Sequence, residues 1–365
     1  MKYLLVETDK IISNIELIRQ TAGDSQLIAV LKANAYGLGL REIYPVLRQC
    51  GVRKLAVTEP EDALTLRELG AEDEEILVLR STACTEDIEK IFAACATATV
   101  GSYDAAVALN GMAENKGMTC DVHIKIDTGM GRYGFEPSET ERILSVFSYM
   151  SNLNVTGMYT HFSCAYLNPT KTKAQHETFL KVAETIRKAG FDPGMLHDCN
   201  SAALFACHLD DHLDAVRIGS AISGRMTAKG SFGLKKTGVM YSQIAEIRWL
   251  PKGHGVGYGS AFVTSKAMRI GVIPVGTADG FMVEKARDSF RVRDCLRYAL
   301  SDLSRLFRKR RQYVTIGSRK ARVIGHVGTT HTTVDLSDID CPVGTEVQLD
   351  VSPMFVPQSV ERRYK

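Results

Sequence analysis

Lys32 is the first residue of this sequence whose position could support chemistry. It follows a short apolar run at 27–31 (LIAVL) and precedes Gly37 and Gly39. Such a run is typical of a buried strand, and a lysine is rarely left there because burying its ammonium group is costly and lowers its pKa. Position alone supports two interpretations equally. The amine reaches solvent at the rim of a sheet, or it is desolvated and forms a Schiff base with an aldehyde.

Polar side chains also follow four later apolar runs. They are Lys125, Asp127 and Arg132 in VHIKIDTGMGRYGF, His161 in GMYTHFS, Asn200 and Ser201 in HDCNSAA, and Arg217, Gly219 and Ser220 in AVRIGSAISGR. Each has an ordinary explanation on its own: a histidine at a rim, an arginine on the surface, or a helix N-cap. In a barrel of parallel strands, all the carboxyl ends meet at one mouth, so the combination predicts a single site.

The chemistry of this combination suits a phosphate-bearing ligand. Ser201 begins an expected helix, and with the main-chain amides of Gly219 and Ser220 it forms the kind of site that receives a phosphate. The loops after the last two strands are the usual phosphate site of such barrels. Arg132 supplies a fork suited to a carboxylate. Together with the lysine at a strand end, these groups predict a pyridoxal-phosphate enzyme that acts on an amino acid.

Alternating apolar runs and helical segments predict how the chain positions these residues. Eight runs are expected as strands: 27–31, 54–58, 75–79, 96–100, 122–126, 155–159, 195–199 and 215–218. Strands that alternate with helices favour βαβ units and a parallel sheet. Eight such units predict an α/β fold of the (β/α)8 TIM-barrel type, whereas a doubly wound sheet would use fewer strands and a glycine-rich first turn. We place the barrel at 1–230, although residues 1–10 could pair with the second domain.

The pattern becomes mainly β after about residue 225. Strands are expected at 241–249, 269–274, 313–316, 321–326, 332–336 and 346–349, and they predict a second domain at 231–365. A helical pattern at 284–311 interrupts this domain. Its basic end, RLFRKRR, could indicate nucleic acid, but a solvated amphipathic helix is the better interpretation because no nucleic-acid-binding signature accompanies it.

Composition is that of an ordinary globular enzyme. The chain has 365 residues, of which 45% are hydrophobic and 24% charged, and its net charge is +3. The nine cysteines are scattered without metal-ligand spacing, which favours reduced thiols and a cytoplasmic location. There is no pattern typical of a signal peptide or a membrane span, so we expect neither a membrane partner nor a nucleic-acid partner.

Short segments along most of the chain resemble, in order, the sequence blocks of the alanine racemase family. They are KANAYGLG (32–39), IDTGMGRYGF (126–135), YTHFSCA (159–165), NSAA (200–203), VRIG (216–219), VGYG (256–259) and PVGTADGF (274–281). The resemblance implies a barrel followed by a β domain and a pyridoxal 5'-phosphate cofactor. It also implies a homodimer in which the two subunits share their active sites.

The resemblance assigns a set of residues to the cofactor. Lys32 would hold it as a Schiff base, and Arg217, braced by His161, would face its pyridine nitrogen. Phosphate contacts would come from Tyr36, Ser201 and the main chain after the last barrel strand. The whole cofactor-binding group is then Lys32, Tyr36, Asn200, Ser201, Arg217, Gly219 and Ser220.

Two bases are needed for racemisation, because a proton leaves one face of the α-carbon and returns to the other. The resemblance implies Lys32 and, from the partner subunit, Tyr258. Tyrosine is a poor base at its reference pKa of about 10. A hydrogen-bonded chain through His161 to Arg217 would stabilise the phenolate, which places these two residues among the catalytic group. Without the resemblance, Tyr258 in VGYG would be interpreted as a hairpin tyrosine.

The substrate-binding group would contain Arg132, Lys125 and Thr329. Arg132 would bind the substrate carboxylate or a cofactor oxygen, and Lys125 occupies a position that the family can carbamylate. Thr329 and Thr330 stand where the family has a Met-Asp pair, and Thr277 replaces a tyrosine. These changes predict a roomier, less negative entrance. Alanine is the first substrate expected, and serine or a larger amino acid such as lysine or ornithine is the alternative.

Two other function classes share parts of this layout. A non-catalytic pyridoxal-phosphate-binding protein would lack the β domain and its tyrosine, so VGYG at 256–259 argues against it. A decarboxylase of barrel and β domain would place a carboxylate at the pyridine nitrogen. Arg217 therefore favours the racemase.

Overall fold

The protein consists of two compact units. The computed structural model describes residues 1–207, 209, 212–226, 230, 232–284, 287, 290–308 and 312–365. Glu7–Thr237 form the barrel unit, and Met1–Val6 combine with Gly238–Lys365 in the β unit. The boundary expected at 230/231 precedes the one in the structure by a few residues. Of residues 1–10, only Met1–Val6 belong to the β unit.

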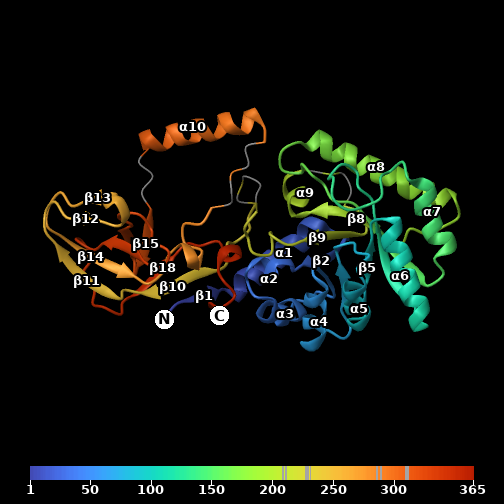
Figure 1. The fold of residues 1–365 in the computed structure, drawn as a ribbon, viewed down its shortest axis with the longest axis horizontal. Helices are drawn as coiled ribbons and strands as arrows, with labels where there is room; N and C mark the ends of the chain where they lie inside the picture. The colour runs from blue at the N-terminus through green and yellow to red at the C-terminus, as the bar shows by residue number, and fades with distance from the viewer. Residues whose placement is uncertain are drawn as a thin grey trace. The chain divides into compact units, whose positions relative to one another are not determined.

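Eight parallel strands form the centre of the barrel unit (Figure 1). They are β2 (Gln26–Val30), β3 (Lys54–Val57), β4 (Glu75–Val78), β5 (Ala98–Val100), β6 (Cys120–Lys125), β7 (Leu153–Tyr159), β8 (Met195–Asn200) and β9 (Ala215–Ile218). Their hydrogen-bonded order is β4-β3-β2-β9-β8-β7-β6-β5, and an isolated parallel bridge between Leu77 and Thr97 links the two ends. The sheet is a nearly closed barrel, which confirms the predicted fold class.

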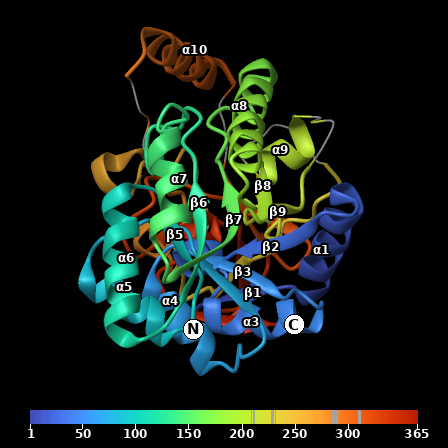
Figure 2. The same cartoon turned by 90° about the vertical axis from the view of Figure 1, so that its right-hand side faces the viewer.

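Helices connect the strands and surround them, as Figure 2 shows. They are α1 (Thr8–Ala22), α2 (Lys32–Tyr36), α3 (Leu40–Gln49), α4 (Pro60–Glu68), α5 (Thr85–Ala93), α6 (Tyr103–Lys116), α7 (Thr140–Tyr149), α8 (Pro169–Lys188) and α9 (Ser201–Ala206). The sequence sets their ends locally. Helix α6, for example, starts after Ser102, whose hydroxyl accepts the amide of Ala105, and stops at Gly117 in the left-handed region.

Strand β2 shows why the barrel strands read as continuous apolar runs. Leu27, Ile28, Ala29 and Val30 are all buried, because one face of a barrel strand meets the interior and the other meets the helices. Burying a large aliphatic side chain contributes about 1.5–3 kcal/mol relative to leaving it exposed. The run ends at Leu31, also buried, so the next residue emerges at the carboxyl end of the strand.

The β unit contains three sheets. Its strands are β1 (Tyr3–Val6), β10 (Val239–Gln243), β11 (Glu246–Leu250), β12 (Gly255–Val256), β13 (Phe262–Val263), β14 (Met268–Ile273), β15 (Tyr313–Ile316), β16 (Arg319–Arg322), β17 (Thr332–Asp335), β18 (Glu346–Leu349) and β19 (Glu361–Tyr364). The sheet orders are β16-β15-β18-β10-β1-β19, β11-β14-β17 and β12-β13. Strand β1 therefore pairs antiparallel with β10 and parallel with β19.

The single strand expected at 241–249 is wrong, because two strands of different sheets occupy this stretch. The chain crosses between the sheets at Ile244 and Ala245. The amide of Ile244 donates to Thr345 beside the first sheet, and that of Ala245 donates to Val272 in the second. The apolar pattern continues through the crossing because Ile244 is itself buried.

Helix α10 (Val292–Arg308) lies within the expected helical segment 284–311, of which residues 285, 286, 288, 289 and 309–311 fall outside the described residues. Large apolar side chains along it are exposed: Val292, Leu296, Leu300 and Leu303. Arg287 forms a bidentate ion pair with Asp302, at 2.6 and 3.0 Å. Among the described residues, no helix is long and apolar enough to cross a bilayer.

Candidate active site

Lys32 begins a left-handed turn at the carboxyl end of β2. Ala33, Asn34 and Ala35 all have φ 53°, and Tyr36 has φ 56°, so consecutive non-glycine residues occupy a region that L-residues avoid. Each such residue costs about 1–2 kcal/mol, and strain of this kind is found at functional sites. The amide of Leu40 donates to Asn34 Oδ1 at 2.7 Å and helps to hold the turn. Lys32 is exposed, so the structure does not show the desolvated amine considered above.

Tyr36, Ser201 and Gly219 meet at one point and form a cradle for an anion. The Ser201 hydroxyl accepts the amides of Gly219 at 3.3 Å and Ala221 at 3.4 Å. A methyl group built on Gly219 would lie 2.4 Å from the Tyr36 hydroxyl, so the absence of a side chain lets the phenol rest on this backbone. Burial raises the pKa of Tyr36 to about 12, which keeps its hydroxyl a donor. Three residues predicted to contact a phosphate are thus together.

Asn200 and Ser220 flank this cradle in the sequence. Asn200 Oδ1 accepts the amides of Ala202 and Ala203 at 3.0 Å each, which makes it the N-cap of α9. This is the ordinary structural role considered for it. The carbonyl of Ser220 accepts the hydroxyl of Ser223 at 2.8 Å and stabilises the turn that follows β9. Both residues therefore shape the main chain around Ser201, and their direct contact with a cofactor stays a prediction.

Arg217 is buried in the barrel interior, where acceptors from neighbouring strands surround its guanidinium group. Its NH1 donates to the carbonyl of His197 at 2.7 Å and contacts Nδ1 of the same residue at 2.8 Å. Its NH2 donates to the Thr160 carbonyl at 2.5 Å and lies 3.5 Å from Nδ1 of His161. The ring of Tyr159 lies under the cation, 4.8 Å from centroid to Cζ. The brace predicted from His161 is therefore long, and His197 supplies the shorter contact.

His161 marks the point where the cations of the mouth converge. Its pKa is lowered to about 3, chiefly by burial and further by four nearby positive charges: Arg217, Arg132, Lys32 and Lys125. An imidazole surrounded by cations binds a second proton only weakly, so the ring of His161 stays neutral. The same charges attract a phosphate or a carboxylate. The cations predicted at separate strand ends therefore lie close enough to His161 to act on it together.

Lys125 and Arg132 belong to this site through the loop after β6. The carboxylate of Asp127 holds the loop, because it accepts the amides of Gly129, Met130 and Arg132 at 2.6–2.9 Å. Lys125 is buried, and burial lowers its pKa to about 8. Its amine donates to the carbonyl of Tyr133 in the same loop. Arg132 is exposed, so its guanidinium group is accessible to an anionic ligand.

Tyr258 and Thr329, the predicted site residues of the second domain, lie in the β unit. Tyr258 is 80% exposed on the short 3-10 turn η1 (Tyr258–Ser260) and makes no contribution to the core of its own unit. The exposed Thr277 and Thr329 lie on neighbouring loops: the amide of Thr277 donates to Gly328 at 3.0 Å, and that of Ala278 to Thr329 at 2.9 Å. Two substitutions far apart in the sequence thus form one surface.

Sequence reasoning missed two histidines of the barrel interior, His123 on β6 and His197 on β8. Both are buried, and a hydrogen bond of 2.8 Å joins Nδ1 of His123 to Nε2 of His197. The available signal was their inward register: His123 pairs with Gly157, and His197 pairs with Tyr159. A polar ring in an apolar strand interior requires a partner.

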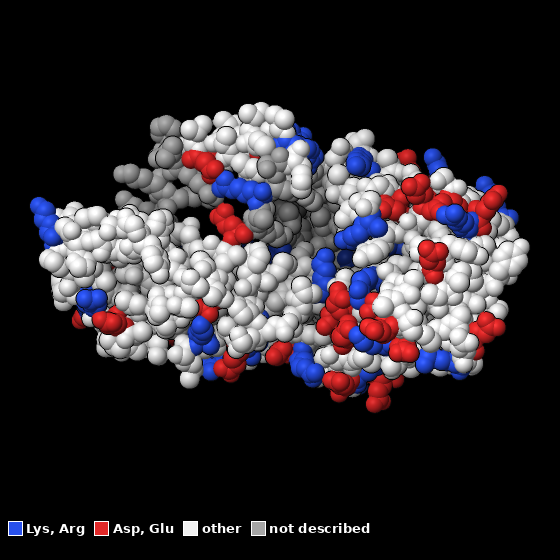
Figure 3. Space-filling view, viewed as in Figure 1, with Lys and Arg blue, Asp and Glu red and all other residues white. Residues whose placement is uncertain are grey.

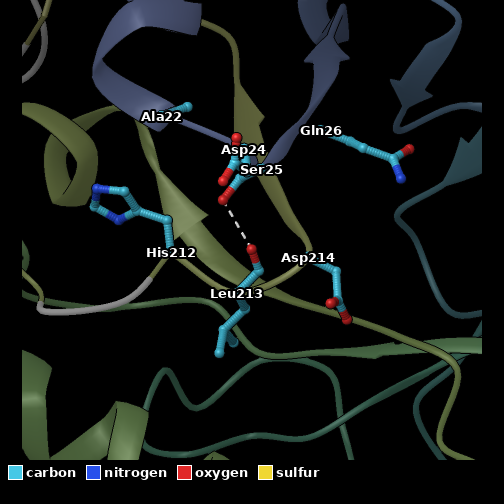
Figure 4. Close-up of a pocket in the computed structure, with 7 residues that line it drawn as sticks. All are labelled: Ala22, Asp24, Ser25, Gln26, His212, Leu213 and Asp214. Carbon is cyan, nitrogen blue, oxygen red and sulfur yellow. Dashed lines mark hydrogen bonds between the residues drawn. The ribbon is translucent and has the colours of Figure 1, made fainter.

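A pocket of about 490 Å³ lies at the other end of the barrel (Figure 4). It opens beside the start of β2 and the segment before β9, and its lining residues are Ala22, Asp24, Ser25, Gln26, His212, Leu213 and Asp214. Ser25 donates to the carbonyl of Leu213 at 2.7 Å across it. It contains none of the predicted site residues. The surface of the barrel unit in Figure 3 carries interspersed acidic and basic side chains rather than a continuous basic stripe.

The residues at the mouth fit pyridoxal phosphate. The Tyr36 hydroxyl lies against Gly219, and the Ser201 hydroxyl accepts the Gly219 amide, so both hydroxyls can donate to a phosphate in a cradle that a methyl group on Gly219 would fill. The Lys32 amine lies 5.7 Å from the Tyr36 ring centroid, within the same turn. A primary amine, a phosphate cradle and a buried arginine form the donor set for this group.

Comparison with known proteins identifies the family. The model of the alanine racemase N-terminal domain matches residues 6–226, and that of the alanine racemase C-terminal domain matches 239–353. The chain belongs to the alanine racemase family. It is 34% identical to the alanine racemase of Clostridium tetani over 76% of this chain and 72% of that protein. It shares 30% identity with the alanine racemase of Halothermothrix orenii over 92% of this chain and 83% of that protein. These matches confirm the resemblance and the isomerase class.

A solved structure of the family shares the whole fold. The alanine racemase of Clostridium difficile 630 superposes with a TM-score of 0.85 at 26% identity, covering 100% of this chain and 95% of that one. The barrel followed by a mainly β domain is thus the architecture of this family.

Proposed function

We propose that this chain is a pyridoxal-phosphate-dependent alanine racemase that interconverts L- and D-alanine. It acts in the cytoplasm as a homodimer in which Tyr258 of each subunit completes the site of the other. Relatives named alanine racemases support the reaction, and nine free cysteines fit a reducing compartment. The exposure of Tyr258 fits a residue that works on another subunit.

The left-handed turn after β2 carries this proposal. One strained turn presents both the amine of Lys32 and the phenol of Tyr36, which rests on Gly219 in the anion cradle. A backbone strained by several kcal/mol persists only where the surrounding contacts hold its conformation. The turn thus places the cofactor attachment point, Lys32, and the phosphate contact, Tyr36, in one rigid segment. An ordinary strand-end lysine has no need of such a turn.

The residues of the mouth orient the cofactor. When bound, pyridoxal phosphate draws electron density from the α-carbon of an attached amino acid and so acidifies its α-proton. Arg217 would hold the pyridine nitrogen as a donor that keeps its own proton, since a guanidinium stays charged in proteins. Such a contact would weaken the electron withdrawal and limit side reactions such as transamination.

Lys32 and Tyr258 then act on opposite faces of the α-carbon. The Lys32 Nζ exchanges the proton on one face, and the Tyr258 hydroxyl of the partner subunit exchanges it on the other. Arg217 can only donate to Nδ1 of His161, so the neutral ring carries its proton on Nε2 and donates it to the oxygen of this phenol, which favours the phenolate. With its pKa lowered to about 3, His161 is neutral near pH 7 and keeps this single N–H as the donor.

The substrate carboxylate is bound by Arg132, whose loop is held by Asp127. Lys125 lies next to this loop, and its lowered pKa leaves part of the amine neutral near pH 8, the form that reacts with carbon dioxide to give a carbamate. The threonines at 277 and 329 shape the entrance and set how much larger than alanine a substrate can be.

Reconstitution of the purified protein with pyridoxal phosphate tests the proposal. We expect chiral chromatography to show racemisation of alanine well above that of serine, lysine and ornithine. Lys32→Ala should abolish racemisation and the cofactor adduct that borohydride traps, whereas Lys116→Ala, a matched change at an exposed helix end, should alter neither. Trapped cofactor in Lys32→Ala, or failure of the wild type to racemise alanine, would overturn the proposal.

A further inference from the structure

Two buried histidines connect Arg217 to the opposite side of the barrel interior. NH1 of Arg217 lies 2.8 Å from Nδ1 of His197, and Nε2 of His197 lies 2.8 Å from Nδ1 of His123. Nε2 of His123 faces a carboxylate oxygen of Glu75 across 3.9 Å. Five strands take part, because Glu75 on β4 also pairs with Lys54 on β3.

The direction of both hydrogen bonds, from Arg217 to His197 and from His197 to His123, follows from the chemistry of Arg217. A guanidinium group has only donors, so Nδ1 of His197 must be an acceptor. A neutral imidazole that accepts at Nδ1 carries its proton at Nε2, and this proton is directed at Nδ1 of His123. The same logic places the proton of His123 on Nε2, toward Glu75. A reversed chain would require Arg217 to accept a hydrogen bond, which it cannot do.

Both imidazoles are neutral in this arrangement. Burial lowers the pKa of His123 to about 3, and the charges of Lys54 and Arg217 act in the same direction. The pKa of His197 is lowered well below its ordinary value, first by burial and then by Arg217. Protonation of either ring would place a second cation next to the buried guanidinium and remove the acceptor that Arg217 or His197 uses.

The surrounding barrel is built to hold these rings. Tyr159 stacks on His197 with centroids 5.0 Å apart and an interplanar angle of 14°, while its hydroxyl contacts Thr99 at 3.0 Å. Gly157 leaves the space for His123, since a methyl group there would lie 2.7 Å from Nε2 of the ring. The geometry therefore comes from packing on β5, β7 and β8 and does not depend on one contact.

We propose that His197 and His123 are positioning residues that form a one-way hydrogen-bond relay from Arg217 toward Glu75. The relay fixes the guanidinium in orientation and keeps it a pure donor. The negative ends of both ring dipoles point toward Arg217, so they stabilise its charge and oppose loss of its proton to a ligand at the mouth. This catalytic consequence rests on the proposed function, whereas the relay itself is a property of the barrel.

Histidine tautomers in the wild-type holoenzyme provide the direct test. Nitrogen-15 NMR of protein labelled at histidine, with signals assigned by their loss in His197→Asn and His123→Asn, should show unprotonated Nδ1 and protonated Nε2 at both positions from pH 6 to 9. A proton on Nδ1 of either ring, or two protons on either ring at pH 7, would overturn the relay. The result is independent of racemase activity, so it stands even if the proposed reaction fails.

Paired substitutions separate positioning from packing. Asparagine keeps an acceptor near the place of Nδ1, whereas leucine keeps the bulk and removes the acceptor. His197→Leu should lower kcat/KM for alanine roughly 10- to 100-fold, as expected for loss of a hydrogen bond to a charged group, and His197→Asn should stay within about fivefold of wild type. His123→Leu should lower it by about three- to tenfold, and His123→Asn should restore most of that loss.

The same two changes at His212, in the pocket at the other end of the barrel, provide matched controls and should leave kcat/KM unchanged. Melting temperatures identify variants that have lost the fold. If the variants do not fold, the tautomers measured in the wild-type protein decide whether the relay exists. If leucine is tolerated as well as asparagine at both positions, the histidines serve packing alone and the relay is refuted.

Discussion

Gly219→Ala tests whether the anion cradle has the geometry seen here. The added methyl group would lie 2.4 Å from the Tyr36 hydroxyl and from ring carbon Cε2, whereas ordinary contacts begin at about 3.4 Å. Tyr36 must therefore move by about 1 Å, because the new methyl group is fixed to the main chain and the tyrosine side chain is the part of the contact that can shift. The φ of Gly219 lies outside the left-handed region, so alanine is compatible with the backbone, and the effect should come from this displacement alone.

The displacement should weaken cofactor binding more than folding. Losing one hydrogen bond to a charged phosphate costs about 1.5–3 kcal/mol, which is roughly a 10- to 150-fold higher Kd. Titration of the apoprotein with pyridoxal phosphate, followed by absorbance, measures the change. In a Tyr36→Ala background the clash is absent, so Gly219→Ala should then add less than about threefold. If the two effects are additive, or if Gly219→Ala binds like wild type, the phenol does not rest on Gly219 and the cradle is wrongly drawn.

Three further predictions concern the assembly, a buried lysine and the entrance. Unfolding and refolding equal amounts of Lys32→Ala and Tyr258→Phe together should restore about a quarter of the wild-type activity. Half of the dimers are then mixed, and each mixed dimer has one intact site out of two. No recovery of activity would show that each chain completes its own site. Lys125→Met should raise the melting temperature at pH 7, because the lysine has a pKa of about 8 when folded and 10.5 when unfolded, so its burial penalty is full below pH 8 and fades toward pH 10.5. A constant difference from pH 7 to 11 would contradict the lowered pKa. The double change Thr277→Tyr and Thr329→Met should reduce kcat/KM for lysine relative to alanine by at least about tenfold, and an unchanged ratio would show that the entrance does not select by size.

The barrel could be predicted because its signal is local. Each of its strands is a short apolar run between helices, and the run at 27–31 placed Lys32 at a strand end, where the structure also has it. The convergence of Arg132, His161 and Arg217 then followed from the topology of parallel strands. Chemistry at strand ends is visible in a sequence because a charge interrupts an apolar run.

Other features depend on contacts that no single run contains. The left-handed turn includes two alanines, which avoid positive φ, so its conformation depends on contacts such as those of Tyr36 with Gly219 and of Asn34 with the Leu40 amide. His123 and His197 lie within strands, where a lone histidine has the same pattern as a core residue. The stretch 241–249 failed for a similar reason, since the buried Ile244 hides the passage from one sheet to another.

The pairing of β1 between β10 and β19 has a consequence for how the chain is made. Residues 3–6 leave the ribosome more than 350 residues before one of their two partner strands, Glu361–Tyr364. The barrel unit, Glu7–Thr237, can complete its own contacts while this first strand still has two open edges. The sheet of the β unit can form completely only after Glu361–Tyr364 has been synthesised, so β1 must wait for this partner strand. A β unit expressed separately would need Met1–Val6 supplied as a peptide or joined by circular permutation.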